Sequence, residues 1–390
     1  MKLEGLRVVD LSLFLPGPHL TLMMADHGAE VIKIEPPGEG EPNRHIGPRE
    51  GSQSVYFRNT HRGKKSVVLN LKVPAAREAL LRLCDRADVF VEAFRPGVAA
   101  RLGFDAATLR ARNPRLVYCS IAAFGQRGPD RELPAHDLAI QARSGTVSVN
   151  LGDDGQPAMP GMPSADMASS LMALSAILMA LYRRETTGRG DFIDLSMQDA
   201  LMAWLPNVTG AVFAQKRPPV VKHERTWGGA AFYRIYATRD GRHVVLGGQE
   251  PKFIRNLLTD LGRPEFIGLC EQGPGPHQAP VIEFLAGVFA QRTQQDWVEW
   301  FRGRDVCFAP VLNLREAFDG EHVRERGMLI TDAAGREHIG VPMRFEEEPG
   351  RAELEAPELG QHTEEVLREA GLDEAQIRAV MSGVEERQRC

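Results

Sequence analysis

The stretch that decides the fold runs from Leu6 to Glu35 and reads LRVVDLSLFLPGPHLTLMMADHGAEVIKIE. It opens with an apolar, β-branched run, continues through a segment of helical spacing between Gly17 and Gly28, and closes with a second apolar run, AEVIKIE. Short apolar runs rich in β-branched residues are typical of buried strands, and a helical pattern between two of them predicts a βαβ unit.

The same alternation continues to about residue 200. Residues 73–87, VPAAREALLRLCDRA, carry apolar side chains three and four positions apart, which predicts a helix. Further strands are predicted at KSVVLNL (65–71), ADVFVEAF (87–94), RLVYCSI (115–121) and DFIDLSM (191–197). Repeated βαβ units predict a Rossmann-like α/β domain, with a mainly parallel sheet and helices on both faces. No GxGxxG opens a helix after these strands, so a dinucleotide site is not predicted.

A second, smaller α+β domain is predicted to begin where KRPPVVKHER (216–225) breaks the pattern. Asp240 and Gly241 lie between two alternating apolar segments, which favours a hairpin. A helix pair carrying Trp297 and Trp300, as core or interface residues, and the strand CFAPVLNL (307–314) follow. The predicted organisation is a large domain over 1–215, a small domain over 216–330, and a segment over 331–390. That last segment holds two short helices broken at Gly371, and we expect it to return to the large domain.

Composition and charge narrow the class of protein. The chain has 390 residues, of which 43% are hydrophobic and 25% are charged, as in soluble globular proteins. A net charge of −5 with dispersed Lys and Arg argues against a nucleic-acid partner. The apolar run from Met167 to Tyr182 is shorter than the roughly 20 residues of a membrane span, so a buried helix is predicted. Without a signal-peptide pattern at the N-terminus, the expected location is cytoplasmic.

The five cysteines are widely spaced and include no CxxC. This spacing predicts reduced thiols and no zinc site, and we expect no metal at all. The cysteines are Cys84, Cys119, Cys270, Cys307 and Cys390.

Four residues form the candidate chemical set. His136 and Asp137 lie in PAHDLAIQARSG, Asp166 begins the long apolar helix after MPSA, and Glu250 lies in GGQEPKF. An imidazole and three carboxylates can take up and release protons. Asp166 alone also fits a helix N-cap, and His136, Asp137 and Glu250 are each compatible with structural roles, so both interpretations stay open at this level.

An ordered set of short motifs extends over essentially the whole chain. The motifs are GLRVVDLS with PGP, ADHGAEVIKIEPPG, RGKKSVVLNLK, FVEAFRPGVAARLG, NPRLVY, FGQRGP, AD before the apolar helix that ends in TGRGDFIDLSMQDA, and LGQHTEEVL. As an ordered set, these motifs resemble the family III CoA-transferases, which also include the α-methylacyl-CoA racemases.

The resemblance implies an enzyme that acts on acyl-CoA thioesters as an interlocked homodimer, with the site between the large domain of one chain and the small domain of the other. It implies two possible reactions. In the racemases, the residues matching His136 and Asp166 remove and return the proton next to the thioester carbonyl. In the transferases, the residue matching Asp166 attacks the thioester and forms a mixed anhydride, and a second carboxylic acid finally receives the CoA.

The motifs favour the racemase branch. The pair His136 and Asp137 stands where transferases usually carry a tyrosine before the acid, and Glu250 completes the racemase motif G-x-x-E-P-x-F. Leu15 stands where oxalate-type transferases carry glutamine. PGMPSADMASSL and DLAIQARSG, however, are closer to the transferases, so CoA transfer stays an alternative. A non-catalytic CoA-ester-binding partner subunit is a third possibility, against which the retained Asp166 argues.

In the racemase interpretation Asp137 and Glu250 orient and tune the two bases. Glu250 would pair with His136 across the chain interface, and N–H groups at the start of the helix that carries Asp166 would meet the enolate oxygen.

CoA itself requires cationic and apolar partners. The compact basic stretch Arg62, Lys64, Lys65 and Lys72 is electrostatically suited to phosphate groups. The resemblance implies that the residues contacting CoA are Lys33, Ile34, Leu69, Lys72, Phe94 and Arg101. Coenzyme A would be part of the substrate and no prosthetic group is expected.

Overall fold

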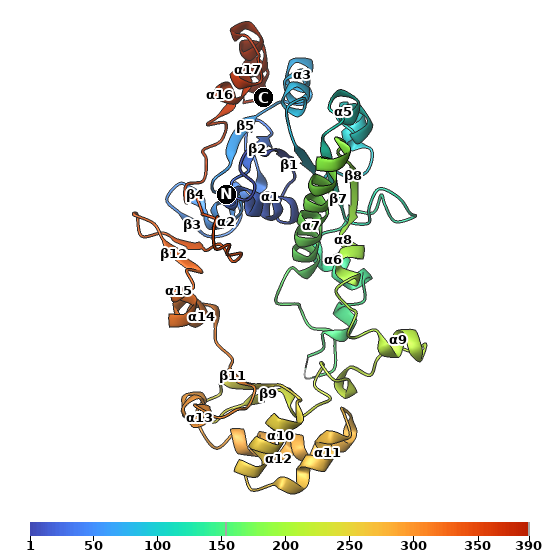
Figure 1. The fold of residues 1–390 in the computed structure, drawn as a ribbon, viewed down its shortest axis with the longest axis vertical. Coiled ribbons are helices and arrows are strands. Elements are labelled where there is room, and N and C mark those ends of the chain that lie inside the picture. Colours follow the sequence, from blue (N-terminus) through green and yellow to red (C-terminus); the bar gives the residue numbers. More distant parts are fainter. Residues whose placement is uncertain (153, 389–390) are drawn as a thin grey trace. The chain divides into compact units, whose positions relative to one another are not determined.

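The computed structural model describes residues 1–152 and 154–388, with side chains described to residue 384, and the chain divides into two units by its internal contacts (Figure 1). Unit 1 comprises Met1–Ser144, Pro160–Trp204 and Glu321–Cys390, and unit 2 comprises Gly145–Met159 and Leu205–Gly320. The domain boundaries predicted from the sequence are residues 216 and 331. In the structure the corresponding boundaries lie 11 and 10 residues earlier, at Leu205 and Glu321. Residues 145–159 belong to unit 2, although no composition shift marks them.

Unit 1 is built on a six-stranded parallel sheet with the strand order β5-β2-β1-β6-β7-β8. All six strands predicted from the apolar runs are confirmed. They are β1 (Arg7–Leu11), β2 (Glu30–Glu35), β5 (Lys65–Val68), β6 (Val89–Glu92), β7 (Val117–Ala122) and β8 (Phe192–Ser196). The register places Val8 beside Val31 of β2 and beside Val89 of β6.

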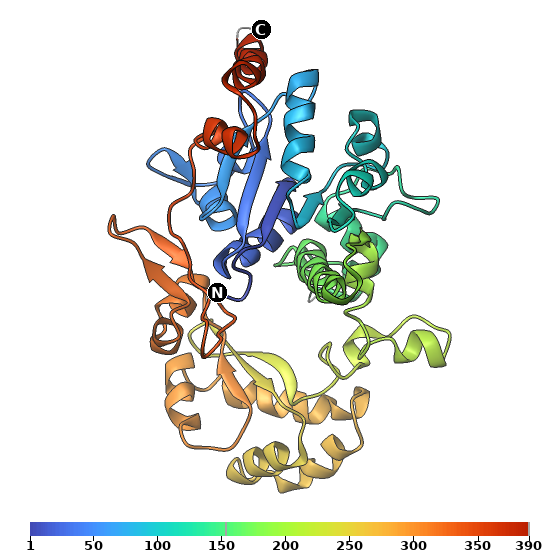
Figure 2. The same cartoon turned by 45° about the horizontal axis from the view of Figure 1, so that its top comes forward.

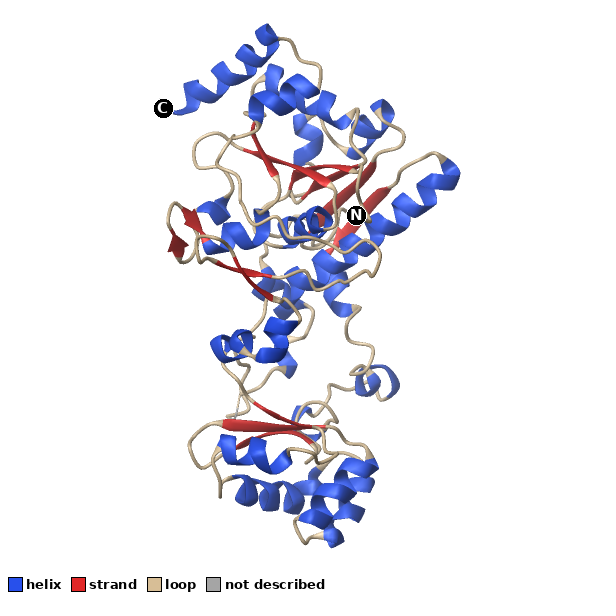
Figure 3. Cartoon of the chain, turned by 60° about the vertical axis from the view of Figure 1, so that its left-hand side comes forward, coloured by secondary structure: helices blue, strands red, loops and turns tan. Residues whose placement is uncertain are grey.

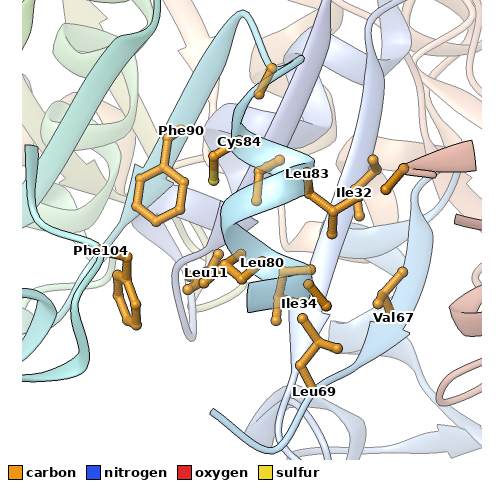
Figure 4. Packing of buried hydrophobic residues seen from close by; sticks show 14 of the residues in the cluster. Leu11, Ile32, Ile34, Val67, Leu69, Leu80, Leu83, Cys84, Phe90 and Phe104 are labelled. Atoms are coloured by element: carbon orange, nitrogen blue, oxygen red, sulfur yellow. The ribbon is translucent and has the colours of Figure 1, made fainter. Parts of the chain in front are cut away.

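Both faces of this sheet are covered along its inner strands, which explains why these strands are largely apolar, whereas the edge strand β8 is partly exposed. On one face, alternate strand residues such as Val9, Ile32 and Phe90 form a core with α3 (Pro74–Cys84), and Figure 4 shows this packing. On the other face, Val8, Val31 and Val117 pack with α1 (Pro16–Asp26) and α7 (Ser164–Thr187). Figure 3 shows helices on both sides of the sheet.

The C-terminal segment returns to unit 1, as predicted. Val366 of α16 (Thr363–Glu369) and Ile377 of α17 (Glu374–Gln388) enter the same core as α3, and Figure 2 shows these helices beside α3. Gly371, between the two helices, has φ +81°. The positive φ suits glycine and explains why the helix stops at this position.

The remaining elements of unit 1 are short. They are β3 (Arg49–Glu50), β4 (Gln53–Ser54), α2 (Val55–His61), α4 (Val98–Leu102), α5 (Ala106–Arg112), α6 (Asp137–Arg143), α8 (Met197–Met202), α15 (Glu321–Glu325), β12 (Leu329–Thr331), β13 (Glu337–Ile339) and a 3₁₀ turn (Pro42–Arg44).

Unit 2 contains an antiparallel sheet in the order β11-β10-β9, with helices packed against it (Figure 3). The predicted hairpin is confirmed: the Thr238 N–H donates to the Arg242 carbonyl at 2.9 Å, and Gly241 has φ +74°. Trp297 is buried in the core of this unit. The elements are α9 (Gly210–Ala214), β9 (Tyr233–Ala237), β10 (His243–Gly247), α10 (Pro251–Asp260), α11 (Ile267–Glu271), α12 (Ala279–Phe289), α13 (Gln294–Phe301), β11 (Phe308–Pro310), α14 (Leu314–Asp319) and four 3₁₀ turns (Val147–Val149, Val221–His223, Pro264–Phe266, Pro276–Gln278).

Helix α7 is longer than the apolar run suggested. Within the described residues it is the one helix that could cross a membrane by length and composition alone, and 44% of its most apolar window is buried inside the protein. Ala173, Ile177 and Leu181 on its buried side belong to the core between the sheet and the helices.

Candidate active site

The sheet of unit 1 changes direction of winding between β1 and β6, which are neighbours although far apart in sequence. In open α/β sheets, ligands bind at the carboxyl ends of the strands where the order reverses, because the loops after the two central strands run to opposite sides and leave a crevice. A cavity of about 760 Å³ lies there. Its walls include residues that follow β1, β6 and β7, namely Leu13, Phe14, Ala93, Phe94, Arg95 and Ala123.

Two of the predicted chemical residues, Asp166 and His136, line this cavity. Asp166 is the third residue of α7, and the N-cap position is occupied by Pro163, so the N-cap interpretation of Asp166 was wrong. Burial, together with the nearby carboxylate of Asp137, raises the pKa of Asp166 from 3.8 to about 7. A carboxyl group with such a pKa can both accept and donate a proton near neutral pH.

Asp137 caps helix α7 from a distance of 29 residues in sequence. Its Oδ1 accepts the backbone N–H of Ala165 at 2.8 Å and of Asp166 at 3.1 Å, while its Oδ2 accepts from Nε2 of Gln141 at 2.6 Å. The negative carboxylate also lies favourably at the positive end of the helix dipole. Asp137 therefore fixes the position of Asp166 and raises its pKa.

This cap contradicts one expectation. The N–H groups at the start of α7 were expected to meet an enolate oxygen, but Asp137 occupies two of them. The N–H of Ser164 donates to Met162 O at 2.9 Å, and that of Met167 donates to Pro163 O at 3.1 Å. All four N–H groups from Ser164 to Met167 are thus engaged, and the helix contributes only its dipole to charge stabilisation in the cavity.

His136 precedes α6 as its N-cap residue and is exposed. Its ring meets the ring of Phe14 edge to face, with 5.5 Å between centroids and 89° between planes. Phe14 was not singled out from sequence, although its place directly after a central strand is a usable signal. Its φ is +62°, a conformation that costs a non-glycine residue about 1–3 kcal/mol and that the surroundings must hold.

Glu250 belongs to unit 2, where it is exposed and precedes α10 without accepting a capping hydrogen bond. Its role in the chemistry stays a prediction.

Four of the residues expected to contact CoA gather at a second hollow of about 290 Å³. These residues are Ile34, Leu69, Lys72 and Phe94. Leu13 and Phe94 line both this hollow and the larger cavity, so the two adjoin. Arg101 is exposed in the last turn of α4, next to Leu102, which also lines the hollow.

The Lys33 ammonium is engaged by groups inside the protein. Its side chain is buried, and Nζ lies 3.1 Å from Oε2 of Glu41 and donates to the Ser12 carbonyl. The ammonium of Lys33 is therefore engaged inside the protein, and the contact with CoA that the resemblance implies for this residue stays a prediction.

Most of the basic stretch is also paired with acids of the protein, Arg62 and Lys64 in the interior and Lys65 at the surface. Arg62 pairs with Asp26 at 2.9 Å, buried Lys64 lies 3.4 Å from Asp10, and Lys65 pairs with Glu30 at 3.0 Å and with Glu365 at 2.8 Å. The expectation of a phosphate-binding face over Arg62–Lys65 was wrong, because the partner acids come from distant parts of the sequence. Lys72 is exposed and keeps its predicted role.

Two cations that sequence reasoning passed over line the main cavity. Arg95 follows β6 in the motif FRPG, and Arg131 lies in the loop before His136, with its Nε 3.2 Å from Glu132. Their position after central strands was the available signal. No group of three or more potential metal ligands occurs among the described residues.

Three comparisons describe what the chain resembles. The alpha-methylacyl-CoA racemase of Homo sapiens is 33% identical over 394 residues, covering 97% of this chain and 95% of that protein. The succinyl-CoA:glutarate CoA-transferase of Mus musculus is 31% identical over 397 residues, covering 98% of this chain and 90% of that protein. Among solved structures, a CAIB/BAIF family protein from Brucella suis has a TM-score of 0.81 and 29% identity, covering 94% of this chain and 99% of that one.

The two kinds of relative carry different activities at nearly equal identity, so they identify a family and leave the reaction open. The family model described as CoA-transferase family III matches residues 3–363, which is nearly the whole chain. On this match, and on relatives that are aligned from end to end, the chain belongs to the CoA-transferase family III.

Proposed function

We propose that this protein racemises 2-methylacyl-CoA thioesters, with His136 and Asp166 as the two groups that exchange the α-proton. The family supplies the enzyme class, since relatives are named as racemases or as CoA-transferases. The observation that carries the choice is the pKa of Asp166, raised to about 7 by burial and by Asp137, on the wall of a cavity that His136 also lines.

The chemistry demands such a pair. The proton next to a thioester carbonyl is weakly acidic, and removing it requires a positioned base whose pKa lies near the working pH. Inversion requires a second group that returns a proton to the opposite face. A carboxyl group titrating near 7 and an imidazole can each act as base for one epimer and as acid for the other.

The assignment is tested by deuterium uptake in heavy water. Each epimer offers its α-proton to a different base, so His136→Gln and Asp166→Asn should abolish uptake from opposite epimers. His45→Gln removes an exposed histidine outside the cavity, and Asp199→Asn removes an exposed first-turn carboxylate of α8, so both serve as matched controls. Absence of exchange with a panel of chiral 2-methylacyl-CoAs at saturating enzyme would reject the racemase proposal.

CoA transfer is the second candidate, favoured by the resemblance to a CoA-transferase at 31% identity. In that reaction an oxygen of Asp166 attacks the thioester carbonyl, CoA leaves as the thiolate, and a mixed anhydride remains on the enzyme. CoA then attacks the Asp166 carbonyl, which releases the original acid and leaves a thioester on Asp166. The acceptor carboxylate attacks this thioester and expels CoA as the thiolate, and the thiolate attacks the acceptor's carbonyl in the second anhydride, which frees the Asp166 carboxylate. Hydroxylamine or borohydride trapping after incubation with an acyl-CoA would mark Asp166 only in this case, as seen by mass spectrometry.

The same trapping and exchange assays address a third candidate of another class, a CoA-ester-binding partner subunit without turnover. Such a protein would bind the thioester and yet show neither deuterium uptake nor a modified Asp166. The retention of a carboxyl group with a raised pKa inside a cavity argues against it.

In either reaction we propose that CoA lies along the adjoining hollow. Lys72 and Arg101 would hold its phosphates, and Leu69, Ile34 and Phe94 would pack against its apolar parts, which suits the hollow's composition. The shared residues Leu13 and Phe94 would then direct the thioester toward Asp166.

We also propose that two chains form an interlocked homodimer, in which Glu250 of one chain approaches His136 of the other. An apolar stripe on α7 supports a covering partner: Leu171, Leu178, Met179 and Tyr182 are exposed at helical spacing, and Tyr182 is 84% exposed. Exposed apolar side chains that gather on one helix face are a feature of protein–protein interaction sites. Sedimentation analysis tests the dimer independently of any activity.

A further inference from the structure

The loop between β1 and α1, residues Ser12–Leu15, is held by buried groups that the proposed chemistry does not use. Its central residue, Phe14, adopts φ +62°, although nothing in a phenylalanine side chain favours that conformation. The surrounding groups hold the Phe14 backbone in this conformation. A strained backbone that is held in this way points to a function for the side chain that it presents.

The main chain of this loop is fixed at three points. The Phe14 N–H donates to Oε1 of Glu41 at 2.9 Å, the Phe14 carbonyl accepts from Nδ2 of Asn43, and the Ser12 carbonyl accepts from Nζ of Lys33. Glu41, Asn43 and Lys33 are all buried. The other carboxylate oxygen of Glu41 pairs with Lys33 at 3.1 Å, so the groups that hold the Phe14 N–H and the Ser12 carbonyl are joined to each other.

The loop also closes tightly on itself. A Cβ at Gly17 would lie 2.1 Å from Oγ of Ser12, so only glycine fits opposite this serine. Ser12 is held in turn by Asp10, whose Oδ1 accepts the Ser12 backbone N–H at 2.9 Å. Buried charges with opposite partners resist displacement, because moving either one leaves an uncompensated charge in the interior.

The result of this arrangement is the position of one ring. The Phe14 side chain meets the His136 imidazole edge to face, and both residues line the cavity with Asp166. His136 is exposed and makes no capping bond to its own helix. An edge-to-face contact fixes the relative orientation of two rings.

We propose that Phe14 is a positioning residue for His136: the Lys33–Glu41 pair and Asn43 hold it in the left-handed conformation, and its ring sets the direction of the imidazole toward the cavity. This inference rests on the proposed role of His136 as a proton-transfer group. It also assigns Lys33, which the resemblance implies to contact CoA, to the buried groups that hold Phe14 in place.

The test compares Phe14→Leu, which removes the ring, with Phe14→Tyr, which keeps it. Phe192→Leu is the matched control, because Phe192 is exposed to the same degree, 38% against 37%, and lies outside the cavity. We expect Phe14→Leu to lower kcat for α-proton exchange about tenfold or more, with KM nearly unchanged, since misplacing a catalytic group costs rate rather than binding. Phe14→Tyr and Phe192→Leu should stay close to the unmodified enzyme.

An independent readout is the proton spectrum of the His136 ring in the full-length protein, assigned with His136→Gln. Loss of the neighbouring ring current should shift these resonances in Phe14→Leu and not in Phe192→Leu. Asn43→Ala, which acts on Phe14 through its main-chain carbonyl, should shift them as well. If the resonances of Phe14→Leu coincide with those of the unmodified protein, or if kcat of a catalytically active preparation does not fall, the proposal is overturned.

The spectrum separates this proposal from the proposed function. An enzyme that exchanges no α-proton but shows the His136 shift refutes the racemase assignment and leaves the contact between Phe14 and His136 intact. An enzyme that exchanges protons normally in every Phe14 variant refutes the positioning role alone.

Discussion

Replacing Asp166 with asparagine should stabilise the protein while removing its activity, and the gain should depend on pH. The pKa of this carboxyl group is 3.8 in the unfolded chain and about 7 in the folded protein. A group that binds its proton more tightly when folded opposes folding once it ionises. Its penalty is absent below about pH 4, grows as the pH rises toward 7, and is constant above that value.

The magnitude follows from the shift of about three pKa units. At about 1.4 kcal/mol per unit, the ionised carboxylate lowers the free energy of unfolding by about 4 kcal/mol at pH 8.5 and by about 2 kcal/mol at pH 5.0. Asparagine has nearly the same shape and carries no charge at either pH. Any packing effect of the substitution is independent of pH, so the difference between the two gains isolates the ionisation.

Urea unfolding of the unmodified protein and of Asp166→Asn at both pH values, at one protein concentration, measures this difference. We expect the variant's gain at pH 8.5 to exceed its gain at pH 5.0 by about 2–3 kcal/mol. Asp199→Asn, the exposed first-turn carboxylate of α8, controls for removing a charge near a helix start. Equal gains at the two pH values would refute the claim that burial and Asp137 hold the pKa of Asp166 near neutrality.

The other predictions concern the surroundings of the site. Asp137→Asn removes the like charge beside Asp166, so the limb of the pH–rate profile near pH 7 should move to lower pH. A limb that does not move would show that Asp137 does not raise the pKa of Asp166. Asp137→Ala, which also deletes the cap of α7, should cost about 1–2 kcal/mol of unfolding free energy by urea titration. Lys72→Ala with Arg101→Ala should weaken binding of an acyl-CoA about tenfold or more and reduce its salt dependence in calorimetry, and unchanged affinity would remove both residues from the CoA site. Tyr182→Arg should shift sedimentation toward a monomer, and an unaltered profile would show that the α7 stripe is not the covered face.

The sequence predicted the sheet well because its information there is local. Each of the six strands lies in a short, largely apolar run, and burial of the inner strands on both faces favours that pattern. The hairpin at Gly241 and the break at Gly371 were likewise readable from single residues whose positive φ favours glycine.

What the sequence could not show depends on pairs that are distant along the chain. The cap of α7 comes from Asp137, 29 residues before Asp166, and no local pattern distinguishes it from an N-cap aspartate. In the sequence, Lys33 is an ordinary lysine within a strand pattern, and only the tertiary fold shows that its side chain is directed toward Glu41. The acids that engage Arg62 and Lys65 lie up to 300 residues away, so a cationic stretch that the sequence presents as a binding surface is instead paired with acids of the protein.

The return of the C-terminal helices to unit 1 has a consequence for synthesis on the ribosome. Residues 205–320 can complete their own core as soon as they emerge, whereas the face of the six-stranded sheet that carries Val9 and Ile32 is covered only in part, by α3 and its neighbours, until residues 363–384 have been made. Nascent chains should therefore expose the remaining apolar part of this face until the end of translation. The need for chaperones should increase with the time that passes before residues 363–384 are synthesised. A gene that lacks the codons for these residues should yield aggregated protein rather than a smaller enzyme.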